Sequence, residues 1–263
     1  MEIGISTASL FMRKYNEDAL VTLNEIDSRV CEIFLESFCE YNEDFGKLLK
    51  SRQGSLTVNS VHTLNTHFEP ELFSINPRAK DDAFKILGGV MKAAEQVNAK
   101  YYTFHGKSRI KKDVNYDNYP VLAKGFDEII GECLKSNVIF SLENVVWAMY
   151  NRVGYFSEIR KLCPKLKGVL DIKQARISGE KWQDYLTEMG NDLVTVHVSD
   201  IDDNGKIRLP GKGNFDFTEL FRRLKDVGFD GNILIEVYKD DFGEISELKD
   251  SLDFLRNLKN KVI

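Results

Sequence analysis

The sequence predicts an α/β protein that folds as a single closed (β/α)8 barrel over residues 1–263. Strand-like and helix-like segments alternate from end to end, with no linker or low-complexity tract between them. The length of 263 residues is close to the roughly 250 that are typical of such a barrel. The glycine-rich first turn of an open, doubly wound sheet is absent, which disfavours the main alternative fold.

The predicted strands are short apolar runs bounded by polar residues or glycine. Eight are expected, at residues 2–6, 31–36, 56–62, 101–105, 138–143, 168–171, 193–198 and 232–238. In a parallel barrel all eight would point in the same direction, so their carboxyl ends would lie on one face.

The predicted helices alternate with the strands, and the longest has apolar residues at spacings of three and four. Eight are expected, at residues 18–26, 44–51, 77–97, 121–134, 157–162, 182–189, 216–227 and 245–258. Pro77 favours a helix start, because its missing N–H would be unpaired there anyway. Asp216 can cap the seventh helix and Gly228 ends it. Residues 65–76 are expected to form a loop.

Composition excludes several classes of protein. The formal net charge is −5 and there is no run of Lys and Arg, so nonspecific binding to nucleic acid is disfavoured. No apolar stretch approaches the roughly 18 residues of a membrane helix, and the N-terminus has no signal-peptide core. The four cysteines lack C-x-x-C spacing and indicate buried reduced thiols. These features predict a cytoplasmic protein without membrane partners.

Four apolar runs in the second half of the chain each end on a side chain that can bind a metal ion. These side chains are Glu143, Asp171, His197 and Glu236. Each alone is commonly a solvated or hydrogen-bonded polar group. Together at one end of a barrel, three carboxylates would repel one another unless a cation lay between them. We therefore expect a metal site, and its donors favour Mn²⁺, Mg²⁺ or Co²⁺ and also allow Zn²⁺.

The same positions carry a resemblance to a known superfamily. The residues that carry it are Glu143-Asn144, Asp171, His197, Glu236 and the stretch Leu209-Pro210-Gly211-Lys212-Gly213-Asn214-Phe215-Asp216-Phe217. With them the chain resembles, over nearly its whole length, the xylose isomerase-like TIM barrels. That superfamily includes sugar isomerases, ketose 3-epimerases, inosose dehydratases and endonucleases of the endonuclease IV type.

The resemblance implies an enzyme of carbohydrate metabolism, a divalent-metal-dependent isomerase or epimerase of a sugar, polyol or sugar phosphate. Such an enzyme removes a proton next to a metal-polarised carbonyl and passes through an enediolate. By resemblance, Glu143 and Glu236 exchange the proton, while Asp171 and His197 mainly hold the metal. Relatives of this kind often form homo-oligomers, so a homo-oligomer is expected.

Six further residues are expected to contact the substrate: His62, His105, Lys107, Trp147, Gln174 and Arg208. The two histidines end neighbouring predicted strands, Lys107 can bind an anionic group, and Trp147 can pack on a sugar ring. Gln174 can donate and accept hydrogen bonds to a hydroxyl. Each of these residue types also has a reading without a substrate. The histidines would be hydrogen-bonded pocket residues, Lys107 a solvated lysine, Trp147 a packing residue over the barrel end, and Arg208 a charge at the rim.

Two other functions remain open from the sequence. One is metal-dependent phosphodiester hydrolysis of the endonuclease IV type, and the other is a non-catalytic barrel that binds a sugar. The endonucleases have a histidine where this chain has Gln174 and an Asp-x-His motif where it reads Gly205-Lys206-Ile207-Arg208, so a full three-zinc centre is not expected. Ketose epimerases have an arginine at the position of Asp203.

Overall fold

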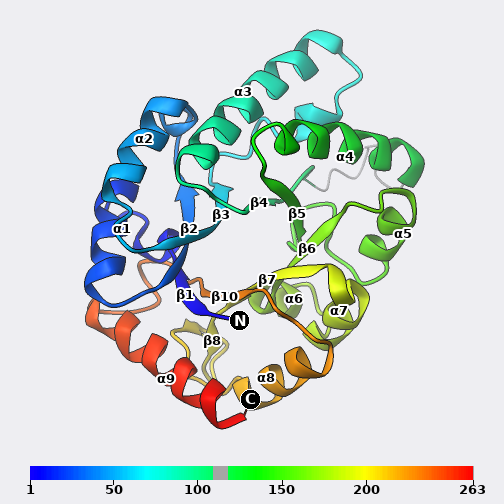
Figure 1. Ribbon diagram of the computed structural model, residues 1–263. Coiled ribbons are helices and arrows are strands. Elements are labelled where there is room, and N and C mark those ends of the chain that lie inside the picture. The colour runs from blue at the N-terminus through cyan, green and yellow to red at the C-terminus, as the bar shows by residue number, and fades with distance from the viewer. Residues whose placement is uncertain (109–117, 263) are drawn as a thin grey trace.

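The computed structural model describes residues 1–108 and 118–262. Eight parallel strands form a closed barrel, and helices surround it as a ring in Figure 1. The barrel strands are β1 (Ile3–Ser6), β2 (Val30–Leu35), β3 (Thr57–Thr63), β4 (Tyr101–Phe104), β5 (Ile139–Glu143), β6 (Lys167–Asp171), β7 (Leu193–Val198) and β10 (Asn232–Ile235). The barrel closes where β1 pairs with β10, with Ile3 opposite Ile233. The predicted (β/α)8 fold is confirmed.

Seven of the barrel strands agree with their predicted bounds to within one residue, and β10 is shorter than predicted. The reason is that its neighbour β7 ends at Val198, which pairs with Ile235. Beyond that point the Val237 N–H donates to the Ser9 hydroxyl, at 3.3 Å, instead of to a strand. The chain after β10 is therefore a loop over the barrel end.

The helices of the described residues include the eight predicted ones. These are α1 (Asn16–Glu25), α2 (Glu43–Arg52), α3 (Pro77–Gln96), α4 (Tyr119–Leu134), α5 (Tyr155–Leu162), α7 (Trp182–Met189), α8 (Phe217–Asp226) and α9 (Ser246–Val262). Pro77 is the first residue of α3, as predicted. Asp216 Oδ1 accepts the Glu219 N–H at 2.9 Å, and Gly228 has a φ of +68° just after α8. Both signals for the bounds of α8 are confirmed.

Two features at the carboxyl end of the barrel were not expected from the sequence. A short helix, α6 (Ile172–Ile177), begins directly after Asp171, and Asp171 caps it by accepting the Gln174 N–H at 2.8 Å. A small antiparallel hairpin of β8 (Asp200–Ile201) and β9 (Ile207–Arg208) follows β7. The predicted loop over residues 65–76 also contains a 3-10 turn at Pro70–Phe73. All of these segments are too short to show a hydrophobic period.

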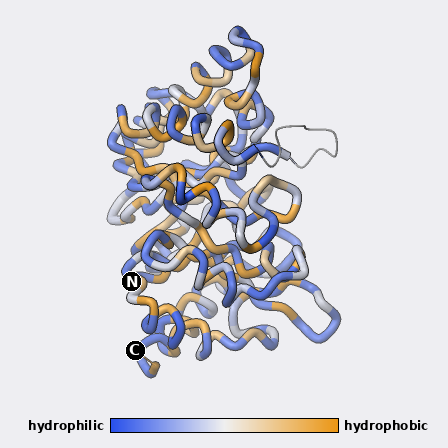
Figure 2. The backbone as a smooth tube through the Cα atoms, turned by 90° about the vertical axis from the view of Figure 1, so that its right-hand side faces the viewer, coloured by the Kyte–Doolittle hydropathy of each residue, from blue (hydrophilic) through white to orange (hydrophobic). Residues whose placement is uncertain are grey.

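The apolar core lies between the strands and the surrounding helices. Figure 2 shows hydrophilic and hydrophobic segments alternating along the outer helices, as amphipathic helices require. In α8, for example, Leu220, Phe221 and Leu224 are fully buried. Each such side chain stabilises the fold by roughly 1.5–3 kcal/mol relative to exposure.

The inside of the barrel, in contrast, is polar. The Asn59 side chain of β3 donates to the Thr195 hydroxyl of β7 at 2.9 Å, although these strands are not neighbours. Ser60 and Thr103 donate to a Glu32 carboxylate oxygen at 2.7 and 2.8 Å. These bonds run across the interior, so the barrel has a hydrogen-bonded polar floor beneath its carboxyl end.

The cysteines are free thiols, of which Cys31, Cys133 and Cys163 are buried as expected. Cys39 is exposed, which corrects the expectation for that residue, because it lies in a 3-10 turn at the surface and not in strand β2. Within residues 1–108 and 118–262, none of the helices combines the length and the apolar character needed to cross a bilayer.

Candidate metal centre

The four predicted ligand-type side chains converge at the carboxyl end of the barrel. Glu143 and Asp171 end β5 and β6, His197 lies in β7, and Glu236 directly follows β10. All four are at most 4% exposed. His197 Nδ1 lies 3.1 Å from Glu143 Oε1 and 3.1 Å from Glu236 Oε2. The four strands are successive neighbours in the barrel, so side chains far apart in sequence meet at one point.

Asn144 fixes the position of the Asp171 backbone. Its Oδ1 accepts the Asp171 N–H at 2.8 Å, and its Nδ2 donates to the Asp171 carbonyl oxygen at 2.9 Å. The Asp171 carboxylate is held separately by the Gln174 N–H of α6. The Glu143-Asn144 pair therefore supplies one acidic side chain and one that aligns the next strand end.

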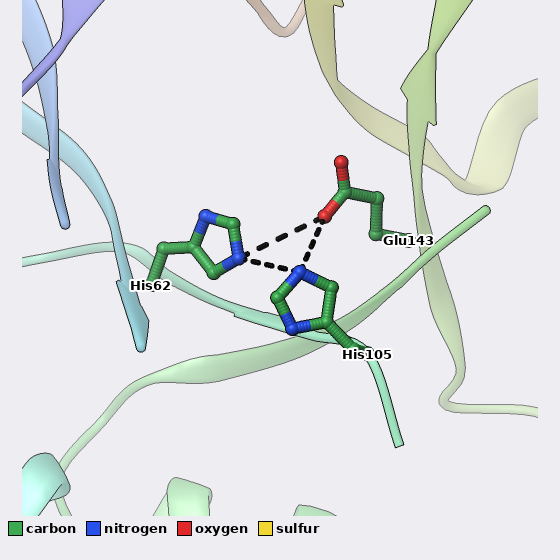
Figure 3. Close-up of side chains that lie close together, drawn as sticks. All are labelled: His62, His105 and Glu143. Atoms are coloured by element: carbon green, nitrogen blue, oxygen red, sulfur yellow. Dashed lines mark hydrogen bonds and ion pairs between the residues drawn. The ribbon is translucent and has the colours of Figure 1, made fainter. Parts of the chain in front are cut away.

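His62 and His105 lie beside this cluster, on the next strands around the barrel (Figure 3). Their Nε2 atoms are 2.8 Å apart. The His105 Nε2 lies 3.3 Å from Glu143 Oε2, and the His62 Nε2 lies 3.9 Å from the same oxygen. This geometry agrees with the prediction that both histidines face the pocket. Glu143 lies next to this histidine pair and also next to His197.

Glu32 is a central member of the cluster that the sequence did not reveal. It is fully buried in β2 and accepts hydrogen bonds from the side chains of Ser6, Ser60 and Thr103. Its carboxylate also lies 3.2 Å from His197 Nε2. Glu32 thus orients His197 from below, so that the other ring nitrogen faces the carboxylates of Glu143 and Glu236. The available signal was a glutamate within an otherwise apolar strand pattern.

Glu69 is a second buried carboxylate that was missed, and it comes from the predicted loop. It accepts the N–H groups of His105 and Gly106 at 3.2 and 2.7 Å, and the Tyr102 hydroxyl at 3.1 Å. These bonds tie the backbone around His105 to the 3-10 turn. Glu69 lies in irregular structure with no periodic pattern around it, so no signal in the sequence pointed to it.

The charges in this cluster shift one another's proton affinity strongly. Burial alone would lower the pKa of His197, but the carboxylates of Glu32, Glu236 and Glu143 outweigh it and raise that pKa well above its ordinary value. Burial would raise the pKa of Glu143, yet His197 and His105 lower it well below its usual range. A positive charge is therefore strongly favoured between these carboxylates.

The pKa values of two further groups show the same imbalance. Burial raises the pKa of Asp171 to about 6, with Lys173 opposing and the carboxylates of Glu143 and Glu236 adding to the shift. Burial opposes protonation of His62, but Glu32 outweighs it and raises the pKa of His62 to about 9. The cluster holds more negative charge than its own cations balance.

The residues present fit a divalent metal. Glu143 Oε2, Glu236 Oε2 and the Nδ1 atoms of His62 and His105 are buried and have no hydrogen-bond partner in residues 1–108 and 118–262. Ligand atoms that lie within 4.8 Å of one another form three overlapping sets: Glu143, Asp171 and His197; His62, His105 and Glu143; and Glu32, His62 and Glu236. Oxygen and imidazole donors in such sets suit hard or borderline divalent ions.

The other four predicted substrate contacts lie at different places around the cluster. The Trp147 ring lies 5.1 Å from the His105 ring and is 40% exposed, at the edge of the cluster. Gln174 Oε1 accepts the Val146 N–H at 3.3 Å, so that oxygen is already used. The Arg208 guanidinium pairs with Asp202 at 2.9–3.0 Å on the hairpin. Lys107 is half-buried after β4, two residues past His105.

The glycine-rich stretch after β7 is organised by one carboxylate. Asp200 accepts the N–H groups of Ile201, Gly211, Gly213 and Phe215, each at 2.8 or 2.9 Å. A Cβ at Gly213 would lie 2.2 Å from the Ile201 carbonyl oxygen, so only glycine fits. The stretch therefore forms a tight loop that holds the hairpin beside the candidate site.

Fold and site together define a class of protein, a (β/α)8 barrel with an acidic, histidine-containing centre at the carboxyl ends of its strands. The chain matches the family described as xylose isomerase-like TIM barrel over residues 4–258. It therefore belongs to that family, as the resemblance predicted. A search of curated proteins finds no match to this sequence.

Solved structures with the same fold include several sugar epimerases. D-psicose 3-epimerase from Clostridium cellulolyticum H10, solved with D-tagatose, has a TM-score of 0.79 at 17% identity, covering 100% of this chain and 99% of that one. The 3-keto-D-glucoside 4-epimerase of E. coli has a TM-score of 0.77 at 16% identity, covering 98% and 99%. The IOLI protein, solved with a bound zinc atom, has a TM-score of 0.78 at 14% identity, covering 100% and 99%.

Proposed function

We propose that this protein is a divalent-metal-dependent isomerase or epimerase of a sugar or sugar phosphate, acting as one domain over residues 1–263. The observation that carries the proposal is the buried cluster of Glu143, Asp171, His197 and Glu236 at the carboxyl end of the barrel. Family membership and the epimerases among the structural neighbours support the same class of reaction.

In this proposal the four side chains of the cluster hold the metal. Three carboxylates and one imidazole favour Mn²⁺, Mg²⁺ or Co²⁺, and a zinc atom in one structural neighbour keeps Zn²⁺ among the candidates. When bound, the ion supplies a positive charge that polarises a substrate carbonyl and makes the neighbouring C–H acidic. Glu32 keeps the His197 ring oriented toward the centre.

Glu143 and Glu236 are the proposed acid–base pair. Both carboxylates keep one buried oxygen without a hydrogen bond to any described residue, and both lie 3.1 Å from His197 Nδ1. One carboxylate removes a proton next to the carbonyl, and a carboxylate returns a proton to the enediolate. Return to the opposite face inverts the carbon, and return to the adjacent carbon isomerises an aldose and a ketose.

The remaining contacts define the outer part of the proposed substrate site. His62 and His105 lie within 4 Å of Glu143 and can donate to substrate hydroxyls. Trp147 lies tilted against His105 at the edge, where a half-exposed aromatic ring can cover the C–H face of a sugar. Lys107, Gln174 and Arg208 stay candidates for the rim. A cytoplasmic location and a homo-oligomer also stay predictions.

A second candidate function is metal-dependent phosphodiester hydrolysis. One observation favours it, since His62, His105 and Glu143 form a second set, overlapping the first at Glu143, that could hold another ion. Against it, Gln174 stands where the endonucleases have a histidine, and the β8–β9 hairpin carries Arg208 paired with Asp202 instead of an Asp-x-His motif. A sugar-binding barrel without catalysis is a third reading, but it does not require a buried acidic cluster.

One experiment separates the three candidates. The protein is loaded with Mn²⁺, Mg²⁺, Co²⁺ or Zn²⁺, and proton NMR in D₂O follows a panel of free and phosphorylated aldoses and ketoses. We expect metal-dependent deuterium uptake at a carbon next to the carbonyl. Nicking of abasic DNA without such exchange would instead support hydrolysis. Sugar binding with neither reaction would identify a non-catalytic barrel.

A further inference from the structure

Lys173 is a buried cation beside the proposed acid–base pair. It lies in the first turn of α6, two residues after Asp171, and is 9% exposed. Its Nζ is 3.8 Å from Asp171 Oδ2 and 3.7 Å from Glu236 Oε1. It also lies 4.9 Å from the centre of the Tyr238 ring. Two carboxylates and one aromatic face thus surround a single ammonium group.

None of these neighbours accepts a hydrogen bond from that ammonium group. The Nζ atom is fully buried and donates no hydrogen bond to any described residue. The distances to Asp171 and Glu236 are those of ion pairs and exceed hydrogen-bond length. An ammonium has three donors, and leaving all of them unused in a buried place is costly. An oxygen atom from outside the chain would satisfy them.

The surroundings show where that oxygen would come from. A cavity of about 240 Å³ opens between α6 and the β8–β9 hairpin, and Lys173 lines it. The other walls are mainly apolar, with Ile172, Ile207 and Phe215 among them. Lys173 therefore lies between the carboxylate cluster and an adjoining cleft. Lys173 is the residue of this cavity lining that also pairs with Asp171 and Glu236.

We propose that Lys173 is a catalytic residue that donates a hydrogen bond to the substrate oxygen that becomes negatively charged. The inference rests on the proposed function. When a carboxylate takes the proton from carbon, the C–H electron pair forms the C=C bond of the enediolate, and the carbonyl π electrons move onto oxygen. That oxygen gains a full negative charge beside the ammonium. The substrate is then a carbonyl compound with a hydroxyl on the neighbouring carbon.

The charge balance of the site supports this role. Three carboxylates and one divalent ion together carry one excess negative charge, and the Lys173 ammonium cancels it. The substrate oxygen that becomes charged then meets a donor beside these ligands. A purely structural lysine would only hold the ligands Asp171 and Glu236 in position. Its loss would then weaken metal binding itself.

The test uses oxalate, whose adjacent negatively charged oxygens resemble those of an enediolate. Oxalate affinity for the Mn²⁺-loaded protein is measured by calorimetry for wild type, Lys173→Met and Lys212→Met. Lys212 is an exposed lysine on the loop after β9, so its variant removes the same charge from the same end of the barrel. Mn²⁺ affinity is measured for each protein by electron paramagnetic resonance.

We expect Lys173→Met to weaken oxalate binding by roughly 10- to 100-fold, the range for a hydrogen bond to a charged group. Its Mn²⁺ affinity should be unchanged or higher, because a cation near the ion is removed. Lys212→Met should match wild type in both measurements. Unchanged oxalate binding in Lys173→Met, no oxalate binding by wild type, or loss of Mn²⁺ from Lys173→Met would each overturn the proposal.

Two additions keep the test decisive. If Lys173→Met does not fold, Lys173→Gln removes the charge with a polar side chain, and the same outcomes apply. For a sugar that the wild type exchanges, Lys173→Met should lower kcat more than it raises KM. If the wild type exchanges no sugar proton, the proposed function fails, while oxalate binding still decides whether Lys173 receives an oxyanion.

Discussion

The two halves of the barrel mouth place buried carboxylates in different ways. In the half built from β5, β6, β7 and β10, Glu143, Asp171 and Glu236 lie at strand ends. In the half built from β1 to β4, Glu32 lies inside a strand and Glu69 in a loop. Both halves bury their acids almost completely, so burial alone does not distinguish them.

The difference lies in what surrounds each carboxylate. Glu32 accepts three side-chain hydroxyl groups, and Glu69 accepts two backbone N–H groups and a tyrosine hydroxyl. Glu143 Oε2 and Glu236 Oε2 accept no hydrogen bond from the described residues, and their near neighbours are the ring nitrogens of His105 at 3.3 Å and His197 at 3.1 Å. A saturated carboxylate positions its neighbours, whereas an unsaturated one is available to a metal or a proton. In the proposed metal centre, the second half therefore supplies the ligands and the first half positions them.

The largest effect should follow from changing the unsaturated carboxylates. We expect Glu143→Gln and Glu236→Gln each to lower the rate of proton exchange by roughly 10²- to 10⁴-fold, because each amide is a poor base and a weaker ligand. Metal content, measured on the purified variants, should also fall. Asp240→Asn, an exposed acid four residues beyond Glu236, is the control and should leave both unchanged. Full activity and metal content in both Gln variants would contradict the assignment.

Changing a saturated carboxylate should affect stability first. In Glu32→Gln, an amide N–H₂ would face hydroxyl donors and the His197 ring in a buried place. We expect the free energy of unfolding to fall by about 2–4 kcal/mol, measured by urea denaturation. Glu36→Gln, a half-buried acid just after the same strand, should change it by about 0.5 kcal/mol or less. If Glu32→Gln lost metal without losing stability, Glu32 would belong with the metal-binding half.

The sequence predicted these two halves unequally, for physical reasons. The carboxyl ends of parallel strands lie on one face, so acids at the ends of β5, β6 and β10 could be brought together without coordinates. The alternation of strand-like and helix-like segments predicted the barrel and the bounds of seven strands to within one residue. Glu32 occupies a strand interior, where alternation alone does not tell the inside of the barrel from the face that the helices cover. Glu69, α6 and the hairpin lie in segments too short for any period.

The third prediction asks whether the first half can bind metal by itself. His62 and His105 form a ligand set only together with Glu143. If the first half only supports the centre, the wild type and His62→Ala should each bind one equivalent of Mn²⁺, measured by metal analysis after dialysis. Exchange in His62→Ala should fall about tenfold, through loss of one hydrogen bond to substrate. Two equivalents of Mn²⁺ in the wild type and one in His62→Ala would show that each half binds a metal ion.

The smallest effect should appear at Glu40, a buried carboxylate of the first half that lies away from the metal cluster. Its Oε2 accepts the Glu36 N–H at 2.6 Å and the Asn16 side chain at 3.2 Å. Burial raises its pKa to about 7, from an ordinary value of 4.5, although these bonds oppose the shift. The folded state thus holds the proton more tightly than the unfolded state. The stabilisation from this group is complete below about pH 4.5 and is lost as pH rises through 7.

Glu40→Gln stays neutral at every pH, so its stability relative to the wild type should increase with pH. Partial solvent screening reduces the effect, and we expect the difference in unfolding free energy to grow by about 1–2 kcal/mol between pH 5 and pH 8. Urea denaturation at both pH values measures it, while proton exchange and metal content should not change. A difference that shrinks with pH would show that the charged carboxylate is the favoured form. Glu40 would then be stabilised by its two hydrogen bonds more than burial opposes it, as Glu32 is by its own partners.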